Sequence, residues 1–321
     1  MTERCRMGTY VIGIDVGGTS VKMGLFDKGG RLICKWSIPT DRSDGGIHIL
    51  PDIALSVKKQ LADKKISLSE AAGAGIGLPG PVMGSQTVYG CPNLGWGRVN
   101  AAAQLSAALD GMKTAAVNDA NAATLGEMWQ GSGKGCSSLV MVTLGTGVGS
   151  GVIIGGQIVE GAFGAAGEIG HMCMNPQETR LCGCGKRGHL EQYASATGIV
   201  RETRAALESS SQPSVLRELS DFDAKAIFDA ARAGDAFALS RVKELADVLG
   251  RALAAVSCVL DPQVFLLGGG VSGAGEFLSS AVQDSYRHYA FSGTEETPVR
   301  IAALGADAGI YGAAKLVLGE E

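Results

Sequence analysis

Apolar and polar residues in the first part of the chain follow two successive patterns. Short apolar runs at residues 9–15, 20–26 and 31–38 are separated by glycine-containing turns, which predicts an antiparallel meander. Apolar side chains then recur at helical spacing through residues 46–64, which predicts a helix. The apolar run at 74–78 predicts a buried strand, so this part of the chain combines strands with helices.

The rest of the chain repeats this organisation. Residues 114–117 predict a strand that ends in polar residues and passes directly into a helix reaching Gln130. Residues 138–144 and 151–154 predict a second hairpin with a glycine-rich turn, like the first. Further helices are expected at 99–109, 190–207, 223–233, 235–259, 275–289 and 307–317, and further strands at 263–267 and 299–304. The length of 321 residues allows two lobes of about 150 residues each, so we predict two related α/β lobes.

Composition and charge exclude several classes of protein. Hydrophobic residues make up 45% of the chain and charged residues 19%, which excludes wholesale disorder. The formal net charge is −4 and the basic residues are scattered, so neither nucleic acid nor an anionic membrane surface is an expected partner. No segment keeps 18 apolar residues and the N-terminus lacks the apolar run of a signal peptide, so we expect a cytoplasmic protein.

Three glycine-rich turns follow apolar strands and suit the binding of phosphate. Glycine lets backbone N–H groups approach an anion closely, threonine adds a hydroxyl, and an aspartate can hold Mg²⁺ or its water. Any one turn could be purely structural, but three together favour phosphate binding between two lobes, and their pattern differs from the Walker and Rossmann fingerprints. The candidate ATP- and Mg²⁺-binding residues are Asp15, Gly17, Gly18, Thr19, Lys22, Thr143, Gly145, Thr146, Gly147, Gly268, Gly269 and Gly270.

Two of the eight cysteines suggest a metal site. Cys182 and Cys184 lie in a glycine-rich segment with His189 after them and His171 before them. Zinc favours four such ligands in a closed tetrahedron, so we predict a structural Zn²⁺ site of two cysteines and two histidines. The alternative is that the cysteines are incidental and the histidines are surface residues. We expect removal of zinc to abolish activity while the N-terminal lobe stays folded.

Several motifs resemble those of the ROK family of sugar kinases and repressors, within the actin-like ATPase superfamily. They are Asp15-x-Gly-Gly-Thr, Asn118-Asp119, Leu144-Gly-Thr-Gly, Gly167-Glu-Ile-Gly-His171 and Cys182-x-Cys-Gly-x-x-Gly-His-x-Glu191, in family order from about residue 10 to the C-terminus. The resemblance implies two actin-like (ribonuclease H-like) α/β lobes around an interlobe cleft. It implies a small lobe of residues 1–119, with a C-terminal helix within 305–321 packing back on it, and a large lobe of residues 120–304 carrying the metal site.

The resemblance also implies roles for individual residues. Asp119 matches the position of the catalytic base, which accepts the proton of the sugar hydroxyl during phosphoryl transfer. The alternative is that Asp119 only caps the helix that follows. Family members usually have three cysteines with the histidine in the metal site, whereas His189 stands here in place of the third cysteine, which could change metal affinity. The positions that match family sugar ligands are Asn93, Asn118, Asp119, Glu168, His171 and Glu191.

The predicted function is that of an ATP-dependent glucokinase, which converts glucose to glucose 6-phosphate in carbohydrate metabolism. The motifs are shared with kinases for N-acetylmannosamine or N-acetylglucosamine and with fructokinases, so the preferred hexose stays open, as does a phosphoryl donor other than ATP. A sugar-responsive repressor of the same family would carry a helix-turn-helix domain, and Asp15 lies too near the N-terminus to leave room for one. The family implies a homodimer or homotetramer.

Overall fold

The computed structural model describes residues 8–319, which form two compact units. Of the described residues, the first unit comprises 8–135, 158–166 and 306–319, and the second comprises 136–157 and 167–305. The expected boundary after residue 119 is therefore wrong, because helix α3 (Asp119–Gln130) packs within the first unit against the C-terminal helix α9 (Ala308–Leu318).

A five-stranded sheet forms the centre of the first unit. Its order is β3-β2-β1-β4-β8, and the predicted antiparallel meander is confirmed as β1 to β3. Strands β4 and β8 lie parallel to β1, so that their carboxyl ends meet at one edge of the sheet. The strands are β1 (Tyr10–Val16), β2 (Ser20–Asp27), β3 (Leu32–Pro39), β4 (Ala71–Leu78) and β8 (Thr114–Asn118).

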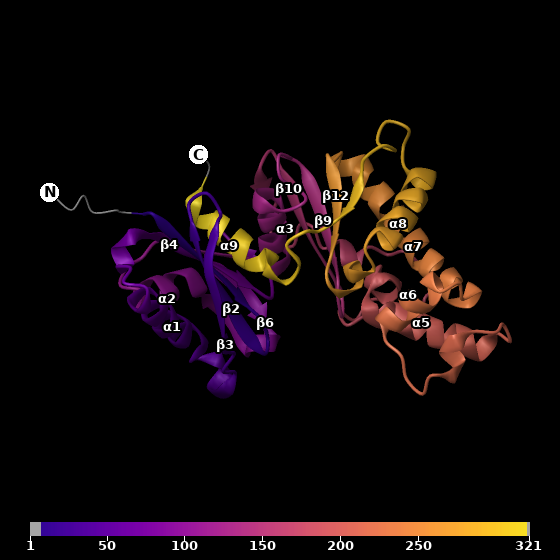
Figure 1. Ribbon diagram of the computed structural model, residues 1–321, viewed down its shortest axis with the longest axis horizontal. Helices are drawn as coiled ribbons and strands as arrows, with labels where there is room; N and C mark the ends of the chain where they lie inside the picture. Colours follow the sequence, from indigo (N-terminus) through magenta and orange to yellow (C-terminus); the bar gives the residue numbers. More distant parts are fainter. Residues whose placement is uncertain (1–7, 320–321) are drawn as a thin grey trace. The chain divides into compact units, whose positions relative to one another are not determined.

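Alternating residues of β1 face opposite sides of this sheet. Ile12 and Ile14 belong to the core that helices α1 (Ile49–Asp63) and α2 (Ala101–Ala108) share with the sheet. Val11 packs instead with residues of α9. Because side chains on a strand alternate, Asp15 falls on the α9 side with Val11. Figure 1 shows α1 and α2 on one side of the sheet and α9 on the other.

Glycines allow the backbone of α9 to touch the sheet and helix α3. A Cβ added at Gly75 on β4 would lie 1.7 Å from the carbonyl oxygen of Ala313, and one added at Gly312 would lie 1.6 Å from that of Ala122 on α3. Neither position tolerates a side chain without movement of the backbone. Helix α9 is therefore an integral part of the first unit, although it is the last element in the sequence.

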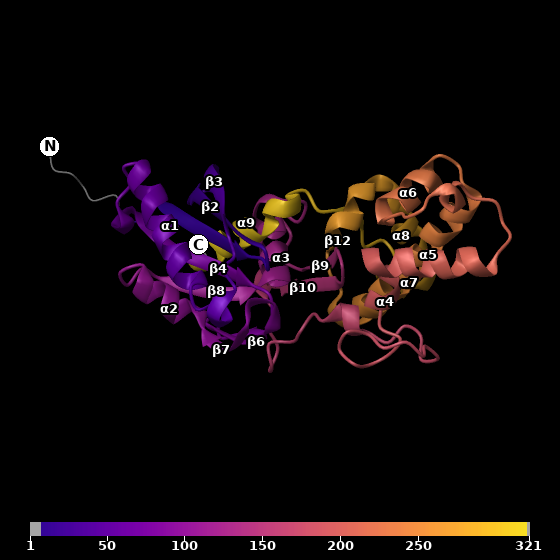
Figure 2. The same ribbon diagram turned by 90° about the horizontal axis from the view of Figure 1, so that it is seen from below.

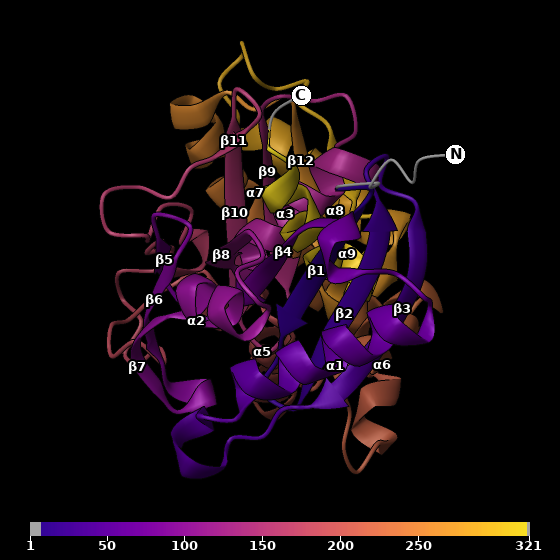
Figure 3. The same ribbon diagram turned by 90° about the vertical axis from the view of Figure 1, so that its left-hand side faces the viewer.

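A three-stranded antiparallel sheet of order β5-β6-β7 was not among the predicted elements of the first unit. Its strands are β5 (Val82–Met83), β6 (Thr87–Cys91) and β7 (Trp96–Asn100), and it lies beside α2 (Figure 3). The 3₁₀ turn η3 (Pro92–Leu94) connects β6 to β7. The unit also has the 3₁₀ turns η1 (Ser43–Gly46), η2 (Leu68–Glu70) and η7 (Gly305–Asp307).

The second unit has its own five-stranded sheet, of order β11-β10-β9-β12-β13. The predicted second hairpin is confirmed as β9 and β10, and β12 runs parallel to β9. Phe265 on β12 contacts the ring of Tyr286 on α8 with centroids 5.4 Å apart, so α8 packs on this sheet (Figure 1). The strands are β9 (Leu139–Leu144), β10 (Val148–Ile154), β11 (Gln157–Ile158), β12 (Val264–Gly268) and β13 (Val299–Ile301).

The helices of the second unit follow a long connection without regular strands (Figure 2). They are α4 (Glu191–Ala194), α5 (Ala196–Ser209), α6 (Ala224–Arg232), α7 (Ala236–Leu260) and α8 (Glu276–Tyr289), with the 3₁₀ turns η4 (Ile169–His171), η5 (Val215–Glu218) and η6 (Gly270–Ala274). The single helix expected over 190–207 is wrong. Ser195 adopts an extended backbone and its side chain accepts the N–H of Gly198, so it ends α4 and caps α5.

None of the helices within residues 8–319 combines the length and the apolar character that crossing a membrane requires.

Candidate active site and metal-binding loop

The turn between β1 and β2 is held by hydrogen bonds to its own strands and to the chain after β3. The N–H of Gly17 donates to the carbonyl of Ser20 at 3.0 Å, and the hydroxyl of Thr40 donates to the carbonyl of Gly17 at 2.7 Å. The N–H of Thr40 donates to the carbonyl of Thr19 at 3.0 Å. Thr19 itself is exposed, and a Cβ added at Gly18 would meet nothing within 4 Å. The tip of the turn is therefore rigid and open to a ligand.

Asp15 precedes this turn and is packed against the start of α9. A Cβ added at Gly309 would lie 2.8 Å from the Asp15 carboxyl carbon, so glycine is needed there. Burial raises the pKa of Asp15, and the charge of Lys22, its cross-strand partner, offsets part of that effect. The Nζ of Lys22 donates to the carbonyl of Ala306 at 3.2 Å, which holds the ammonium group close to the carboxylate.

Asn118 and Asp119 lie where β8 ends and α3 begins. Asn118 caps the helix, because its Oδ1 accepts the N–H groups of Ala120 at 2.9 Å and Asn121 at 3.2 Å, while its Nδ2 donates to Gly80 at 3.1 Å. Asp119 is the first residue of the helix and is exposed, although its Oδ1 also accepts the Ala120 N–H at 2.8 Å. Asn118 is therefore the main cap of the helix, and the Asp119 side chain lies exposed beside it.

Asn93 lies exposed in η3, at the same end of the first unit as Asp119. Burial raises the pKa of the neighbouring Cys91 thiol, and the Asp119 carboxylate raises it further, which places that charge near the β6–β7 connection. A Cβ added at Gly80 would lie 2.8 Å from the carbonyl oxygen of Gly90, so the segment that Asn118 binds also packs on β6. The first unit thus brings together three of the predicted substrate residues.

The two glycine turns of the second unit are neighbours. Thr143 pairs with Gly268 where the parallel strands β9 and β12 end. Gly269 has a φ of 81°, and a Cβ there would lie 2.6 Å from the carbonyl oxygen of Leu144. The N–H of Gly145 donates to the carbonyl of Gly147 at 3.0 Å, which closes the other turn. The predicted phosphate-binding residues of this unit therefore gather at one edge of its sheet.

Glu191 contacts both the glycine turn at Thr143–Gly147 and the metal-ligand cluster. Its Oε2 accepts the N–H of Val148 at 3.1 Å, and a Cβ added at Gly147 would lie 2.2 Å from the same oxygen. Its Oε1 lies 3.6 Å from the thiol sulfur of Cys182, which donates to it. Glu191, a predicted sugar ligand, therefore also contacts the glycine turn between β9 and β10.

Glu168 precedes the short turn η4 and His171 is its last residue, and the turn is anchored on β10. The hydroxyl of Ser150 donates to the carbonyl of Gly167 and accepts the N–H of Ile169 at 3.1 Å. Glu168 and His171 are both exposed, with 3.9 Å between the Glu168 Oε2 and the His171 Nε2. The other ring nitrogen of His171, Nδ1, belongs to the metal-ligand cluster.

The four predicted metal ligands converge, with one ligand atom from each lying within 4.8 Å of the others. Nδ1 of His189 lies 3.2 Å from Nδ1 of His171 and 3.3 Å from Sγ of Cys184, and Sγ of Cys182 lies 3.9 Å from Nδ1 of His171. Ligands at zinc distances in a tetrahedron are roughly 3.3–3.8 Å apart, so the set fits Zn²⁺. Burial lowers the pKa of His189, as does His171, which favours the neutral, metal-binding imidazole.

A cavity of about 340 Å³ lies beside η6, in the second unit. Phe228 and Val271 give it apolar walls, while Asp223 and Arg232 contribute charge. Arg232 is held by a hydrogen bond to the carbonyl of Ala274. These residues were not predicted from the sequence, because their positions on and near α6 have the ordinary pattern of an amphipathic helix.

Two mixed α/β units, each opened by a hairpin with a glycine turn, define a protein of the actin-like ATPase fold. The ROK family model matches residues 11–320, and the chain belongs to the ROK family.

Proteins similar to this chain over nearly their whole length include named sugar kinases. A glucokinase of Halalkalibacterium halodurans is 39% identical, covering 97% of this chain and 96% of the relative. A glucokinase of Thermotoga maritima is 37% identical, covering 96% of each chain. The crystal structure of a ROK family glucokinase from Streptomyces griseus in complex with glucose and AMPPNP has a TM-score of 0.76 and 34% identity, covering 96% of this chain and 98% of its own.

Proposed function

We propose that this protein is an ATP-dependent glucokinase. In the reaction a hydroxyl oxygen of glucose attacks the γ-phosphorus of ATP, the hydroxyl proton passes to a carboxylate, and ADP leaves. The proposal is supported by the names of the full-length relatives and by the ligands of the Streptomyces griseus structure.

The observation that carries the mechanism is the exposed position of Asp119 at the start of α3. Asn118 caps this helix through two backbone N–H groups, and Asp119 is the next residue. Asp119 is exposed at the carboxyl end of β8, where ligands bind in open α/β sheets. We assign it the role of general base, which holds the sugar hydroxyl and accepts its proton.

The phosphates of ATP are assigned to the glycine turns. The β1–β2 turn of the first unit would bind them through the backbone N–H of Gly18 and the hydroxyl of Thr19, with Lys22 supplying positive charge. The turns at Thr143–Gly147 and Gly268–Gly270 would contribute in the same way from the second unit. Asp15 fits Mg²⁺, since carboxylate oxygens are its preferred protein ligands. When bound, Mg²⁺ neutralises charge on the transferring phosphate.

The cavity beside η6 is assigned to the base of the nucleotide. It adjoins Gly270, the last residue of the third glycine turn, and combines apolar walls with a few polar groups, as small-molecule sites do. Phe228 and Val271 would contact the faces of adenine. This assignment favours a nucleotide over polyphosphate as the phosphoryl donor, because polyphosphate has nothing to fill the cavity.

The sugar is assigned to Asn93 and Asp119 of the first unit and to Glu168, His171 and Glu191 of the second. Asn118 orients the segment that contains Gly80, and its remaining capacity for hydrogen bonds is directed to the same ligand. Several polar groups are needed because hexoses differ only in the placement of their hydroxyl groups.

Zn²⁺ is assigned to His171, Cys182, Cys184 and His189. Its role would be structural, since it would fix the loop that carries the sugar ligands. His171 would bind the metal through Nδ1 and offer Nε2 to a sugar hydroxyl.

The test is ADP release with MgATP against glucose, N-acetylglucosamine, N-acetylmannosamine, mannose and fructose. We expect a strong preference for glucose. Preference for an acetamido sugar would keep the assignment as a sugar kinase and change the assigned substrate. No turnover with any of these sugars would overturn the proposal. We also propose a homodimer or homotetramer, which light scattering coupled to gel filtration measures directly.

A further inference from the structure

The metal-binding loop, residues 172–190 between η4 and α4, has little regular structure of its own. Two isolated bridges, Cys173 with His189 and Leu181 with Arg187, and short-range backbone hydrogen bonds such as that from the Cys182 N–H to the Lys186 carbonyl hold its two turns. A loop of this length loses much conformational entropy when it is ordered. Side-chain contacts with neighbouring elements add to these backbone bonds and fasten the loop to the rest of the unit.

Arg180 makes the densest set of these contacts. Its guanidinium donates to Glu178, through Nε to Oε1 at 2.9 Å and through Nη2 to Oε2, in a two-point arrangement. Its Nη1 lies 2.7 Å from Oε1 of Glu202, which belongs to helix α5. The Glu178 side chain is only 7% exposed, so its carboxylate depends on these donors. Arg180 thus joins the loop to a helix of the unit.

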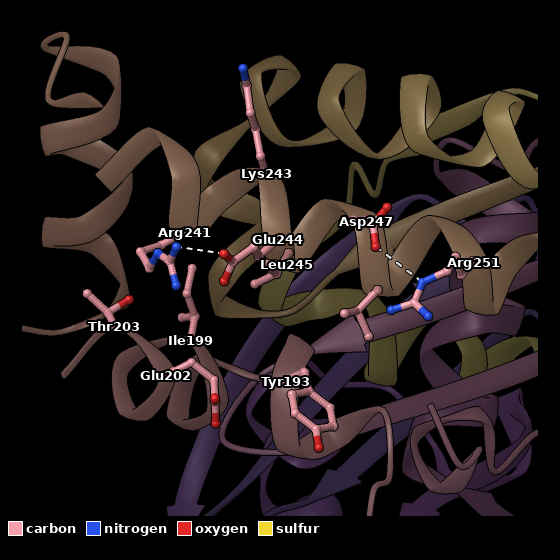
Figure 4. Close-up of a pocket in the computed structure, with 11 residues that line it drawn as sticks. Tyr193, Ile199, Glu202, Thr203, Arg241, Lys243, Glu244, Leu245, Asp247 and Arg251 are labelled. Atoms are coloured by element: carbon pink, nitrogen blue, oxygen red, sulfur yellow. Dashed lines mark hydrogen bonds and ion pairs between the residues drawn. The ribbon is translucent and has the colours of Figure 1, made fainter. Parts of the chain in front are cut away.

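Tyr193 provides a second connection between the same loop and the helical layer. Its hydroxyl donates to Oε2 of Glu178 at 2.7 Å and accepts from Nδ2 of Asn175 at 3.2 Å. Tyr193 and Glu202 both line a groove of about 590 Å³ between α5 and α7 (Figure 4). The loop is therefore fastened to the rim of this groove.

Gln192 carries the connection from Arg180 to a metal ligand. Its Nε2 donates to the backbone carbonyl of Arg180 at 3.2 Å, and its Oε1 accepts the backbone N–H of His189 at 3.1 Å. Gln192 is 4% exposed, so neither bond competes with bulk water. Cys182 follows Arg180 by two residues. The hydrogen bonds of Gln192 and this short stretch of backbone therefore connect two of the four metal ligands, His189 and Cys182.

We propose that Arg180 is a positioning residue for the metal site, which clamps the metal-binding loop onto α5 by joining Glu178 of the loop to Glu202 of the helix. The clamp keeps Cys182 and His189 near the geometry that zinc requires and lowers the entropy lost when the metal binds. This inference rests on the proposed zinc site, and its consequence for catalysis rests on the proposed glucokinase activity.

The principal test compares the zinc affinity of Arg180→Ala with that of the unaltered protein, by competition with a chromogenic zinc chelator. We expect affinity to fall by about 10–100-fold, the range found when partners that orient metal ligands are removed. Arg204→Ala is the matched control, because Arg204 lies on α5, the helix that Arg180 contacts, and pairs with Asp221 outside the metal-binding loop. Equal affinities of Arg180→Ala and Arg204→Ala would overturn the proposal.

Two milder variants guard against misfolding. Tyr193→Phe removes one hydrogen bond to Glu178 without changing shape, and Arg180→Lys retains the charge but cannot bind two carboxylates in a planar fork. We expect both to lower zinc affinity by less than Arg180→Ala, and Arg180→Lys to recover part of the loss. Unchanged affinity in both variants would count against the clamp.

Hydrogen exchange separates failure of the clamp from failure of the zinc assignment. Peptides covering 172–190 should exchange faster in Arg180→Ala than in the Arg204→Ala control, with or without zinc. If the purified protein contains no zinc, that assignment fails while the exchange comparison still tests the clamp. The KM for glucose should rise more than the KM for ATP, and an equal change in both would contradict a role at the sugar side.

Discussion

The base region of the first unit and the metal-binding loop of the second are held in different ways. Asp119 follows the edge strand β8, which is hydrogen-bonded to β4, and the adjacent Asn118 caps its helix. The loop of residues 172–190 depends more on side chains, which include Glu178, Arg180 and three of the four metal ligands. The base region can therefore lose its chemistry without losing its fold, whereas the loop can lose its order while the rest of the protein stays folded.

Removal of zinc should give the largest effect and the clearest separation of the two regions. We expect glucose phosphorylation to be abolished while the first unit stays folded. The three tryptophans, Trp36, Trp96 and Trp129, all lie in the first unit, so their fluorescence reports on that unit alone. Activity should be lost on dialysis against a chelator, assayed with excess Mg²⁺, without a change in tryptophan emission. Restoration by added Zn²⁺ is the control, and full activity in demonstrably zinc-free protein would refute the assignment.

Substitution of Asp119→Asn should remove the chemistry of the base region alone. We expect kcat to fall by about 10²–10⁴-fold, the usual contribution of a positioned general base. The melting temperature should change little, because Asn118 remains as the cap of α3. Asp110→Asn is the control, since Asp110 is an exposed aspartate of the same unit that pairs with Lys58. A kcat within twofold of the unaltered protein would exclude Asp119 as the base.

Gly75→Ala should loosen the first unit and spare the metal-binding loop. The added methyl would lie 1.7 Å from the carbonyl oxygen of Ala313, so the backbone of α9 must move. We expect the free energy of unfolding of this unit to fall by about 1–3 kcal/mol, measured by denaturant titration of tryptophan fluorescence. Gly97→Ala is the control, because a Cβ there meets nothing within 4 Å. Zinc affinity should be unchanged, and a fall in it would show that the two regions are coupled.

The smallest effect expected concerns the pH dependence of stability at Asp15. Burial raises the pKa of Asp15 in the folded state above its ordinary value of 3.8, so folding favours the protonated form. The ionised carboxylate therefore destabilises the protein at neutral pH, and this cost disappears as pH falls through the raised pKa and then below 3.8. Asp15→Asn should raise the melting temperature by a few degrees at pH 7, with a difference that vanishes in acid.

Activity of Asp15→Asn should nevertheless be lower than that of the unaltered protein, since Mg²⁺ binding needs the carboxylate. A lower melting temperature at pH 7 would show that contacts of the Asp15 carboxylate outweigh the cost of its burial.

The secondary structure was predictable wherever apolar residues recurred with one period, that of a helix or of a strand, through a long segment. The meander of β1 to β3 and the helices α1, α7 and α9 all satisfy this condition. The strand β5 has two residues, too few to show any period, so the small sheet was missed. The break at Ser195 was also missed, because the apolar pattern continues across it. The capping signal of Ser195, which accepts the N–H of Gly198, could have revealed that break.

The candidate site was predictable to the extent that its chemistry lies in short motifs. The convergence of His171, Cys182, Cys184 and His189 follows the spacing of the ligands, and the structure brings these four together. The roles of Arg180 and Glu178 could not be inferred, because charged residues in a loop are usually solvated and their partner Glu202 is distant in sequence. The cavity beside Phe228 also depends on tertiary packing, which no local pattern encodes.

The position of α9 determines the order in which the two units can be completed during synthesis. Val11 and Phe26 on the first sheet are covered by Ile310, Ala314 and Val317, which the ribosome adds after every residue of the second unit. Until then, one face of the first sheet lacks its apolar cover, and the exposed apolar surface is a target for chaperones and for aggregation. The half of the protein that is translated first is thus the half that finishes folding last.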